Sequence, residues 1–215
     1  MTKKILILLF ILIPIKANAL IEVDITRGNL NPLPLAVSPL SIDEESRKGF
    51  EKILKKENIG SEISNIVENN LRTSGLFNPL DKKAFLQAPD IANLKPRFED
   101  WNLIKAQALI TGKVNYVDDK LRVEFRLWDV LAAKEMMALA FTTVPNNWRR
   151  VGHIISDKVY ERLTGEKGYF DTRIIYVSEE GPKTQRIKKL AIMDQDGANN
   201  KFLTLGNELV LTPRF

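Results

Sequence analysis

The clearest pattern along the chain is a run of strict alternation between apolar and polar residues. The apolar positions are Leu121, Val123, Phe125 and Leu127, and the positions between them are Arg122, Glu124, Arg126 and Trp128. A period of two indicates a strand with one buried face and one wet face, as in an antiparallel sheet covered on one side. Residues 106–117 and 136–144 also have the composition of strands, and Asp118-Asp119 supplies a turn. The sequence therefore predicts a three-stranded meander.

Other segments repeat with the period of a helix. Apolar residues recur at helical spacing at Ile63, Ile66, Val67 and Leu71, and again at Val151, Ile154, Ile155 and Val159. We predict that Ser61 caps the first helix and that Gly75 stops it, while Gly165 ends the second. Acidic residues early and lysines late predict a further helix over residues 43–56. With an apolar strand over residues 33–40, these elements predict an α/β (α+β) domain at residues 33–168. We expect a two-layer sandwich of helices on a mixed or antiparallel sheet.

The period changes after Gly165. Residues 172–177, 187–193 and 201–205 have the pattern of short strands, with turns at residues 180–182 and 196–199. Residues 169–215 therefore predict the first blade of a β-propeller, since a blade takes about 40 to 45 residues. Propellers close with about four to eight blades. We expect the chain to be a fragment or a natural truncation of a longer propeller protein.

The first nineteen residues have the layout of a secretory signal peptide. Lys3 and Lys4 precede an apolar run over residues 5–15, and Ala17-Asn18-Ala19 supplies the small residues of a cleavage site. The run is far shorter than the roughly 20 residues that a membrane span needs. We predict a signal peptide at residues 1–19, cleavage after Ala19, and no membrane span in the exported chain. Because the sequence contains no cysteine, it offers no disulfide and no cysteine for lipid attachment.

The charge of the chain argues against a nucleic-acid partner. The net charge of +5 falls to +2 when Lys3, Lys4 and Lys16 leave with the leader. Affinity for nucleic acid depends on clustered phosphate contacts. The densest basic segment, residues 183–189, is better interpreted as the solvated face of a strand.

No motif of an enzyme stands out. His153 is the only histidine, and we interpret it as a helix-surface or boundary residue. A zinc site would then need mostly carboxylates, which is poor ligand chemistry for that ion. Asp194-Gln195-Asp196-Gly197 resembles the start of a calcium loop, but its glycine is misplaced, so a hairpin turn is the better interpretation. We expect no catalytic residue, no metal and no cofactor. The three tryptophans, Trp101, Trp128 and Trp148, are scattered along the sequence. We interpret them as residues that pack helices on the edge of the sheet rather than as a sugar site.

The segment after the leader, residues 20–32, is the candidate binding element. Ile21, Val23 and Ile25 alternate with polar residues, which gives a short two-faced strand. Such a strand can extend the edge of a partner's sheet, or it can pair within its own domain, and the pattern alone leaves both readings open. The candidate partner-binding residues are Leu20, Ile21, Glu22, Val23, Asp24, Ile25, Thr26 and Arg27.

Two stretches resemble a known family. Residues 163–177 read LTGEKGYFDTRIIYV and residues 191–199 read AIMDQDGAN, and both resemble the TolB family of the Tol–Pal system. The resemblance also covers residues 71–81, residues 106–117 and the helix from Trp148, and so spans most of residues 60–205. In that family the first stretch joins an N-terminal α/β domain to a β-propeller, and the second matches the outer hairpin of the first blade.

The resemblance implies a periplasmic protein that is not an enzyme. Members of this family link the inner-membrane protein TolA to the outer-membrane lipoprotein Pal, and support outer-membrane integrity and invagination during cell division. Residues from Leu20 to about Leu33 match the TolA-binding segment, and Pal is bound mainly by the propeller. The alternative is a periplasmic hydrolase or glycan-binding protein built on a propeller, and a free-standing small domain is a third reading.

Overall fold

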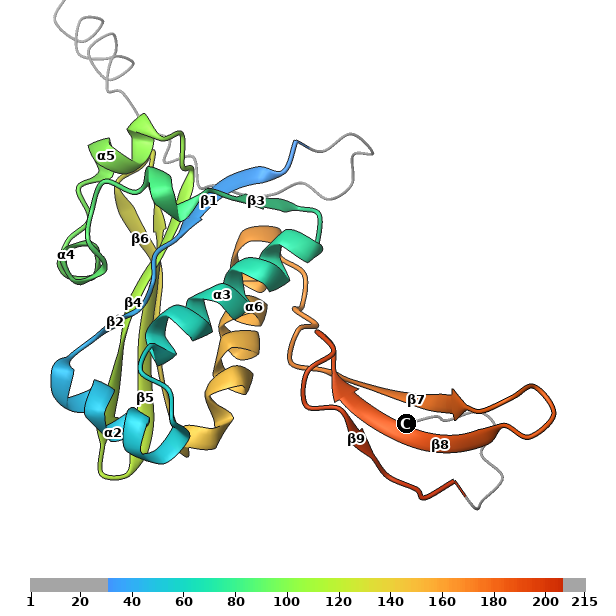
Figure 1. Cartoon of the computed structure of the whole chain (residues 1–215). Coiled ribbons are helices and arrows are strands. Elements are labelled where there is room, and N and C mark those ends of the chain that lie inside the picture. The colour runs from blue at the N-terminus through green and yellow to red at the C-terminus, as the bar shows by residue number, and fades with distance from the viewer. Residues whose placement is uncertain (1–30, 207–215) are drawn as a thin grey trace, which may run out of the picture.

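The structure is a computed structural model that describes residues 31–206. The predicted leader and the candidate residues 20–27 lie outside the described residues, and so do residues 207–215. Figure 1 shows a domain of helices on a sheet, followed by a separate, smaller sheet.

The elements follow one another in an order close to the prediction. Those of the domain are β1 (Leu33–Val37), β2 (Ser41–Ile42), α2 (Glu44–Leu54), α3 (Ile59–Thr73), β3 (Phe77–Pro79), the short helix η1 (Lys82–Ala84), α4 (Pro89–Leu94), α5 (Phe98–Leu103), β4 (Ala108–Val117), β5 (Lys120–Asp129), β6 (Lys134–Thr143), the short helix η2 (Pro145–Asn147) and α6 (Trp148–Thr164). The smaller sheet contains β7 (Arg173–Glu180), β8 (Ile187–Asp194) and β9 (Lys201–Phe202).

The sheet of the domain is mixed, which confirms the predicted α/β class. Its strand order is β3-β1-β4-β5-β6, and β2 also pairs with β4. β1 runs parallel to β3 and β4, whereas β4, β5 and β6 form the predicted antiparallel meander. The turn between β4 and β5 holds Asp118 at φ 51° and Asp119 at φ 58°. Aspartate tolerates this left-handed conformation better than most residues, so the turn is encoded locally.

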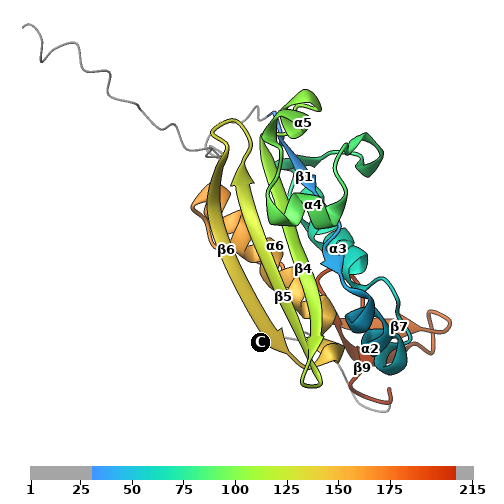
Figure 2. The ribbon, with the colours of Figure 1, turned by 90° about the vertical axis from the view of Figure 1, so that its left-hand side faces the viewer.

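α3 and α6 lie side by side on one face of the sheet (Figures 1 and 2). Gly152 allows the close approach, because a Cβ there would lie 3.0 Å from Ile66 Cγ2. The core between the helices and the sheet includes Leu35, Ile63, Leu71, Ile110, Val123, Phe125, Ile155 and Val159. The apolar face of β5 and the apolar stripes of α3 and α6 therefore pack together in one core, as predicted.

The predicted start of α3 was wrong. The helix begins at Ile59 and its cap position is Asn58, so Ser61 lies inside the first turn. Ile59 is fully buried and lies one turn before Ile63, so burying it extends the apolar stripe of the helix. The predicted end of the helix at Gly75 is close to the observed end, since α3 ends at Thr73 and Gly75 adopts φ 75°.

A second, smaller core on the opposite face of the sheet was not predicted. Segment 80–106 folds over outward-facing residues of β1 and β4 and buries Trp101. Trp101 Nε1 donates to Gln87 Oε1 at 3.2 Å, and Gln87 Nε2 donates to the carbonyl of Arg97 at 3.1 Å. The domain thus has the predicted two layers plus a partial cover on the second face.

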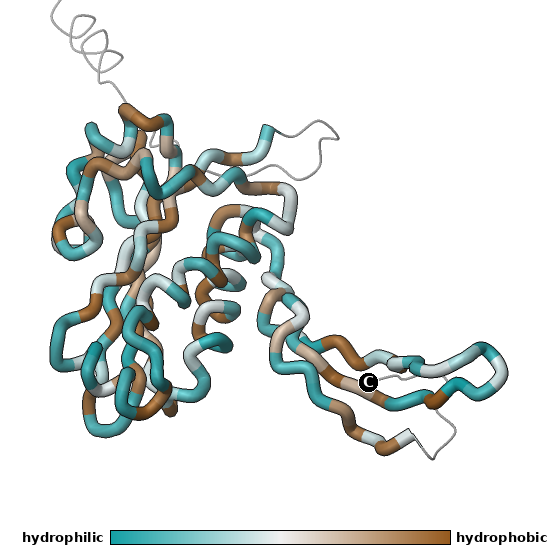
Figure 3. The backbone as a smooth tube through the Cα atoms, viewed as in Figure 1, coloured by the Kyte–Doolittle hydropathy of each residue, from teal (hydrophilic) through white to brown (hydrophobic). Residues whose placement is uncertain are grey.

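The smaller sheet is an antiparallel β7-β8-β9 unit. Of the apolar residues on these three strands, only Ala191 is buried. Figure 3 shows hydrophobic residues along strands that project away from the domain. This arrangement agrees with the propeller blade predicted from the sequence. Among residues 31–206, no helix combines the length and the apolar character needed to cross a membrane.

Candidate functional site at the contact between helix α6 and the β8–β9 turn

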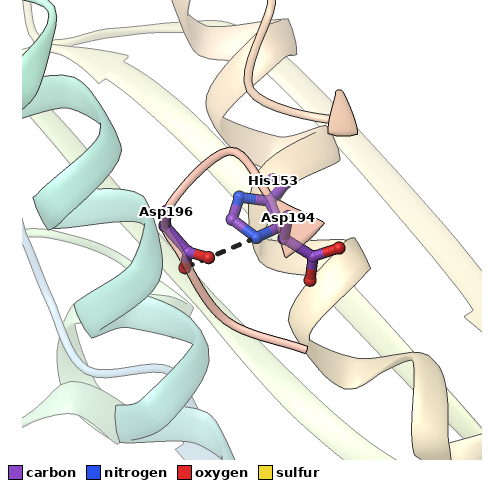
Figure 4. Close-up of side chains that lie close together, drawn as sticks. All are labelled: His153, Asp194 and Asp196. Carbon is purple, nitrogen blue, oxygen red and sulfur yellow. Dashed lines mark ion pairs between the residues drawn. The ribbon is translucent and has the colours of Figure 1, made fainter. Parts of the chain in front are cut away.

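The turn between β8 and β9 folds back against α6. Asp194 N donates to the carbonyl of Ala198 at 2.9 Å, Gly197 N donates to the carbonyl of Asp194 at 2.9 Å, and Gly197 has φ 83°. These contacts confirm the predicted hairpin turn. Figure 4 shows its two aspartates beside the imidazole of His153 on α6.

His153 is buried, contrary to the prediction of a surface or boundary position. The residue is 3% exposed because the β8–β9 turn covers this part of α6. Its Nδ1 lies 2.9 Å from Asn70 Nδ2, and Asn70 Oδ1 in turn accepts a hydrogen bond from Gln195 Nε2 at 2.8 Å. Its Nε2 faces Asp196 Oδ2 at 3.7 Å and has no hydrogen-bond partner among the described residues.

Burial decides the charge of this imidazole. It lowers the pKa of His153 below its ordinary value, and the Arg149 guanidinium acts in the same direction. The Asp196 carboxylate opposes both effects, but burial is the largest influence on this pKa. We therefore treat His153 as neutral at pH 7. Arg149 Nη2 forms an ion pair with the same oxygen of Asp196 that the imidazole faces.

A cleft of about 400 Å³ lies next to these residues. We call it the junction cleft, and its walls include Arg149, Arg150, His153, Asp171, Arg173 and Asp194. Arg150 pairs with Asp171 at 3.1 Å, and Arg173 lies 3.8 Å from Asp194. Because each arginine faces a carboxylate, the cleft carries little excess charge and is not a ready anion site.

The linker from α6 to β7 is fastened to the same helix. Both oxygens of Asp157 accept backbone hydrogen bonds, from Phe170 N at 2.6 Å and from Asp171 N at 3.1 Å. Burial raises the pKa of Asp157, and these two hydrogen bonds act against that rise. The side chain of Phe170 is fully buried in the main core. The contact between the domain and the smaller sheet is therefore built by α6, this linker and the β8–β9 turn, with Asn70 of α3 bonded to Gln195 of the turn.

Three potential metal ligands meet at this contact. One nitrogen of His153 and one carboxylate oxygen each of Asp194 and Asp196 lie within 4.8 Å of one another. Sequence reasoning considered the histidine and the turn separately, because 41 positions separate His153 from Asp194 and only the fold brings them together. The one hint of a metal site in the sequence was the Asp-x-Asp pattern of the turn, Asp194 and Asp196.

The other candidate residues of the sequence fall elsewhere. Residues 20–27 lie outside the described part of the chain, so their partner-binding role stays a prediction. Trp101 and Trp128 belong to the second core, and Trp148 packs against the main core on the other face. The described part of the chain therefore does not gather the tryptophans into a sugar site.

Comparison with known proteins agrees with this architecture. Residues 21–136 match the family described as the TolB amino-terminal domain, and residues 160–215 match the TolB beta propeller domain. The Tol-Pal system protein TolB of Pelagibacter ubique (strain HTCC1062) is 86% identical over 210 residues, which cover 98% of this chain and 47% of that protein. The chain therefore spans about half the length of this curated relative.

A solved structure shares the fold. The crystal structure of TolB from Acinetobacter baumannii matches with a TM-score of 0.64 at 24% identity, over 85% of this chain and 41% of that one. At this identity the likeness bears on the fold alone.

Proposed function

Since this chain belongs to the TolB family of the Tol–Pal system, we propose that it is a periplasmic adaptor that binds other proteins and catalyses no reaction. The observation that carries the proposal is the match of residues 21–136 to the TolB amino-terminal domain, followed by a match to the propeller domain. The adaptor supports outer-membrane integrity and the invagination of the outer membrane during cell division.

The proposal assigns a task to each segment. Residues 1–19 are a signal peptide that is cleaved after Ala19, and residues 20–32 are the partner-binding tail. Residues 33–168 are the α/β domain that carries the tail, and residues 169–215 are the first blade of the propeller. The hydrogen bonds of Asp157 and the buried Phe170 support this division, because they fix the linker at the border between the last two segments.

Two partners follow from this arrangement. A TolA-like inner-membrane protein binds the tail through residues Leu20 to Arg27, and a Pal-like outer-membrane lipoprotein binds the propeller. The alternation of Ile21, Val23 and Ile25 with polar residues supports pairing with the edge of a partner's sheet. Main-chain hydrogen bonds then supply affinity, and the apolar side chains select the partner.

The test compares binding by variants of the tail. Mature chain 20–215 is titrated with the purified periplasmic domain of the TolA-like protein from the same organism. We expect deletion of residues 20–27 to abolish binding, and replacement of Ile21, Val23 and Ile25 by serine to do the same. A matched control replaces the alternate positions (Glu22→Gln, Asp24→Asn, Thr26→Ser) and keeps most of the affinity.

A second arm of the experiment concerns Pal. Residues up to Phe215 supply only the first blade, so mature chain 20–215 should bind a Pal-like lipoprotein far more weakly than the full-length Pelagibacter ubique relative does. Unchanged binding of the TolA-like domain after deletion of residues 20–27 contradicts the role of the tail. Equal binding of Pal by the two proteins contradicts the role of the propeller.

A further inference from the structure

His153, Asp194 and Asp196 come from two elements and lie close together at the edge of the junction cleft, whose walls include His153 and Asp194 (Figure 4). We propose that they bind a first-row divalent cation such as Zn²⁺, and that the ion links α6 to the β8–β9 turn. The inference is independent of the tail and of the adaptor role.

The spacing of the three groups fits an ion after small movements. The ligand atoms lie within 4.8 Å of one another, so the centre of the largest triangle that they can form is about 2.8 Å from each corner. Zinc binds imidazole nitrogen and carboxylate oxygen at about 2.0–2.2 Å. Each side chain therefore has to move by less than about 1 Å, which rotations about side-chain bonds supply.

An unpaired buried nitrogen points to a ligand independently of the acidic pair. His153 is 3% exposed and its Nε2 has no hydrogen-bond partner among the described residues. Buried polar atoms are nearly always paired, because leaving one unpaired costs free energy.

The surroundings of the three groups can orient them for an ion. Asp196 Oδ1 accepts from Ala198 N at 3.1 Å, and Asp194 Oδ2 accepts from Asn199 Nδ2. An ion on Nε2 requires the proton of His153 on Nδ1, where an acceptor is needed. Asn70 provides one by a half-turn of its amide, and Gln195 can turn with it because it is also a primary amide. Asn70 Nδ2 now donates to Ser156 Oγ at 2.9 Å, so after the half-turn this hydroxyl has to donate to Asn70 Oδ1.

Two arginines compete with an ion for the aspartates: Arg173 Nε lies 3.8 Å from Asp194 Oδ1, and Arg149 is the closer competitor. Its guanidinium pairs with the same Asp196 oxygen that faces the imidazole, so a dication must displace it. Its guanidinium carbon also lies 5.4 Å from the ring centre of Trp148, and this cation–π contact gives it a second partner. We therefore expect micromolar rather than tighter binding of the ion.

The ligand set selects the kind of ion. One imidazole with two carboxylates suits Zn²⁺, Co²⁺ or Mn²⁺, whereas Ca²⁺ and Mg²⁺ prefer sites made of oxygen alone. Mostly carboxylate ligands are poor ligand chemistry for zinc, as the sequence analysis noted. This chemistry lowers the affinity of the site for Zn²⁺ but does not prevent binding.

The test titrates Zn²⁺ by calorimetry, and Co²⁺ by its visible absorption, into metal-free mature chain 20–215. We expect one equivalent of each ion to bind, and Zn²⁺ to raise the melting temperature. Asp194→Asn and His153→Gln should each weaken binding by at least about tenfold, since even the loss of a group that only orients a ligand typically costs about 10–100-fold in metal affinity. Circular dichroism and melting in EDTA establish that these variants are folded, and the Asp194 variant is the safer one because that side chain is less buried than His153, at 16% against 3% exposed.

Two arginine variants distinguish binding of the ion at this specific site from a general effect of the protein's charge. Arg149→Gln should tighten Zn²⁺ binding by about tenfold, because it removes the cation that competes for Asp196. Arg150→Gln is the matched control, since Arg150 lines the same cleft but pairs with Asp171, and it should change affinity much less. Absence of binding, binding that ignores Asp194→Asn, or equal effects of the two arginine variants overturns the proposal.

Discussion

The α/β domain and the β7–β9 blade treat their apolar residues in opposite ways. The domain places the apolar face of β5 and the stripes of α3 and α6 in one core, where Phe125 is 1% exposed. In the blade, Ile174 is 40% exposed and Phe202 is 46% exposed. The domain therefore buries its own apolar residues, whereas the blade leaves many of its apolar residues exposed. β9 has only 2 residues, so the blade is little more than a two-stranded hairpin, and an isolated hairpin is marginal in water. We therefore expect the blade to depend on its contact with α6.

Substitution of one phenylalanine in each region gives the largest contrast. Phe125→Ala removes a ring from the main core and should lower the free energy of unfolding by about 3–5 kcal/mol. Phe202→Ala removes an equal volume from a half-exposed site in the blade and should cost less than about 1 kcal/mol. Urea unfolding followed by circular dichroism measures both. Similar losses for the two variants would show that the blade is packed as tightly as the domain.

Two glycines of the linker test how the regions are joined. A Cβ on Gly168 would collide with the Asp157 backbone of α6, whereas a Cβ on Gly165 meets no atom within 4 Å. Gly168→Ala should therefore cost about 1–3 kcal/mol and loosen the blade. Gly165→Ala should cost only the strain of its φ of 76°, about 1–2 kcal/mol, with the blade still docked.

Limited proteolysis within residues 165–172 provides the readout for these glycine variants. We expect faster cleavage of Gly168→Ala than of Gly165→Ala at matched fractions of folded protein. Equal rates of cleavage would mean that the linker does not hold the blade against α6.

A helix cap within the domain gives a smaller effect that depends on pH. Asp43 accepts a hydrogen bond from Ser46 N at 2.7 Å at the start of α2, and Asp43→Ala should cost about 1 kcal/mol at pH 7. This hydrogen bond lowers the pKa of Asp43 below its ordinary value of 3.8. Because the folded pKa is depressed, the charge of Asp43 stabilises the fold fully above the unfolded pKa, and this stabilisation is lost as the pH falls through the folded pKa.

Comparison with Asp43→Asn isolates the contribution of that charge. The difference in unfolding free energy between wild type and Asp43→Asn should shrink from pH 6 to pH 2, as measured by urea unfolding. A difference that stays constant over this range would show that the cap works through hydrogen bonding alone.

The regular part of the domain was predictable because its signals are local. Alternation over residues 121–128 predicted β5, and the two apolar stripes predicted α3 and α6. The segment with α4 and α5 was not predicted, because each of these helices has 6 residues and such short helices give no period. Burial of His153 was not predictable either, because a turn more than forty residues later covers it. Local patterns thus give the elements, while the junction cleft depends on contacts between distant segments.

Native-state hydrogen exchange of mature chain 20–215 tests most directly whether the domain is self-sufficient and the blade is not. We predict that amides of β4 and β5 exchange only through global unfolding, whereas those of β7 and β8 exchange through local opening at much lower free energy. Removal of residues 169–215 should leave the protection of β4 and β5 nearly unchanged. Equal protection of the two sheets, or loss of protection in β4 and β5 after that removal, would contradict the account.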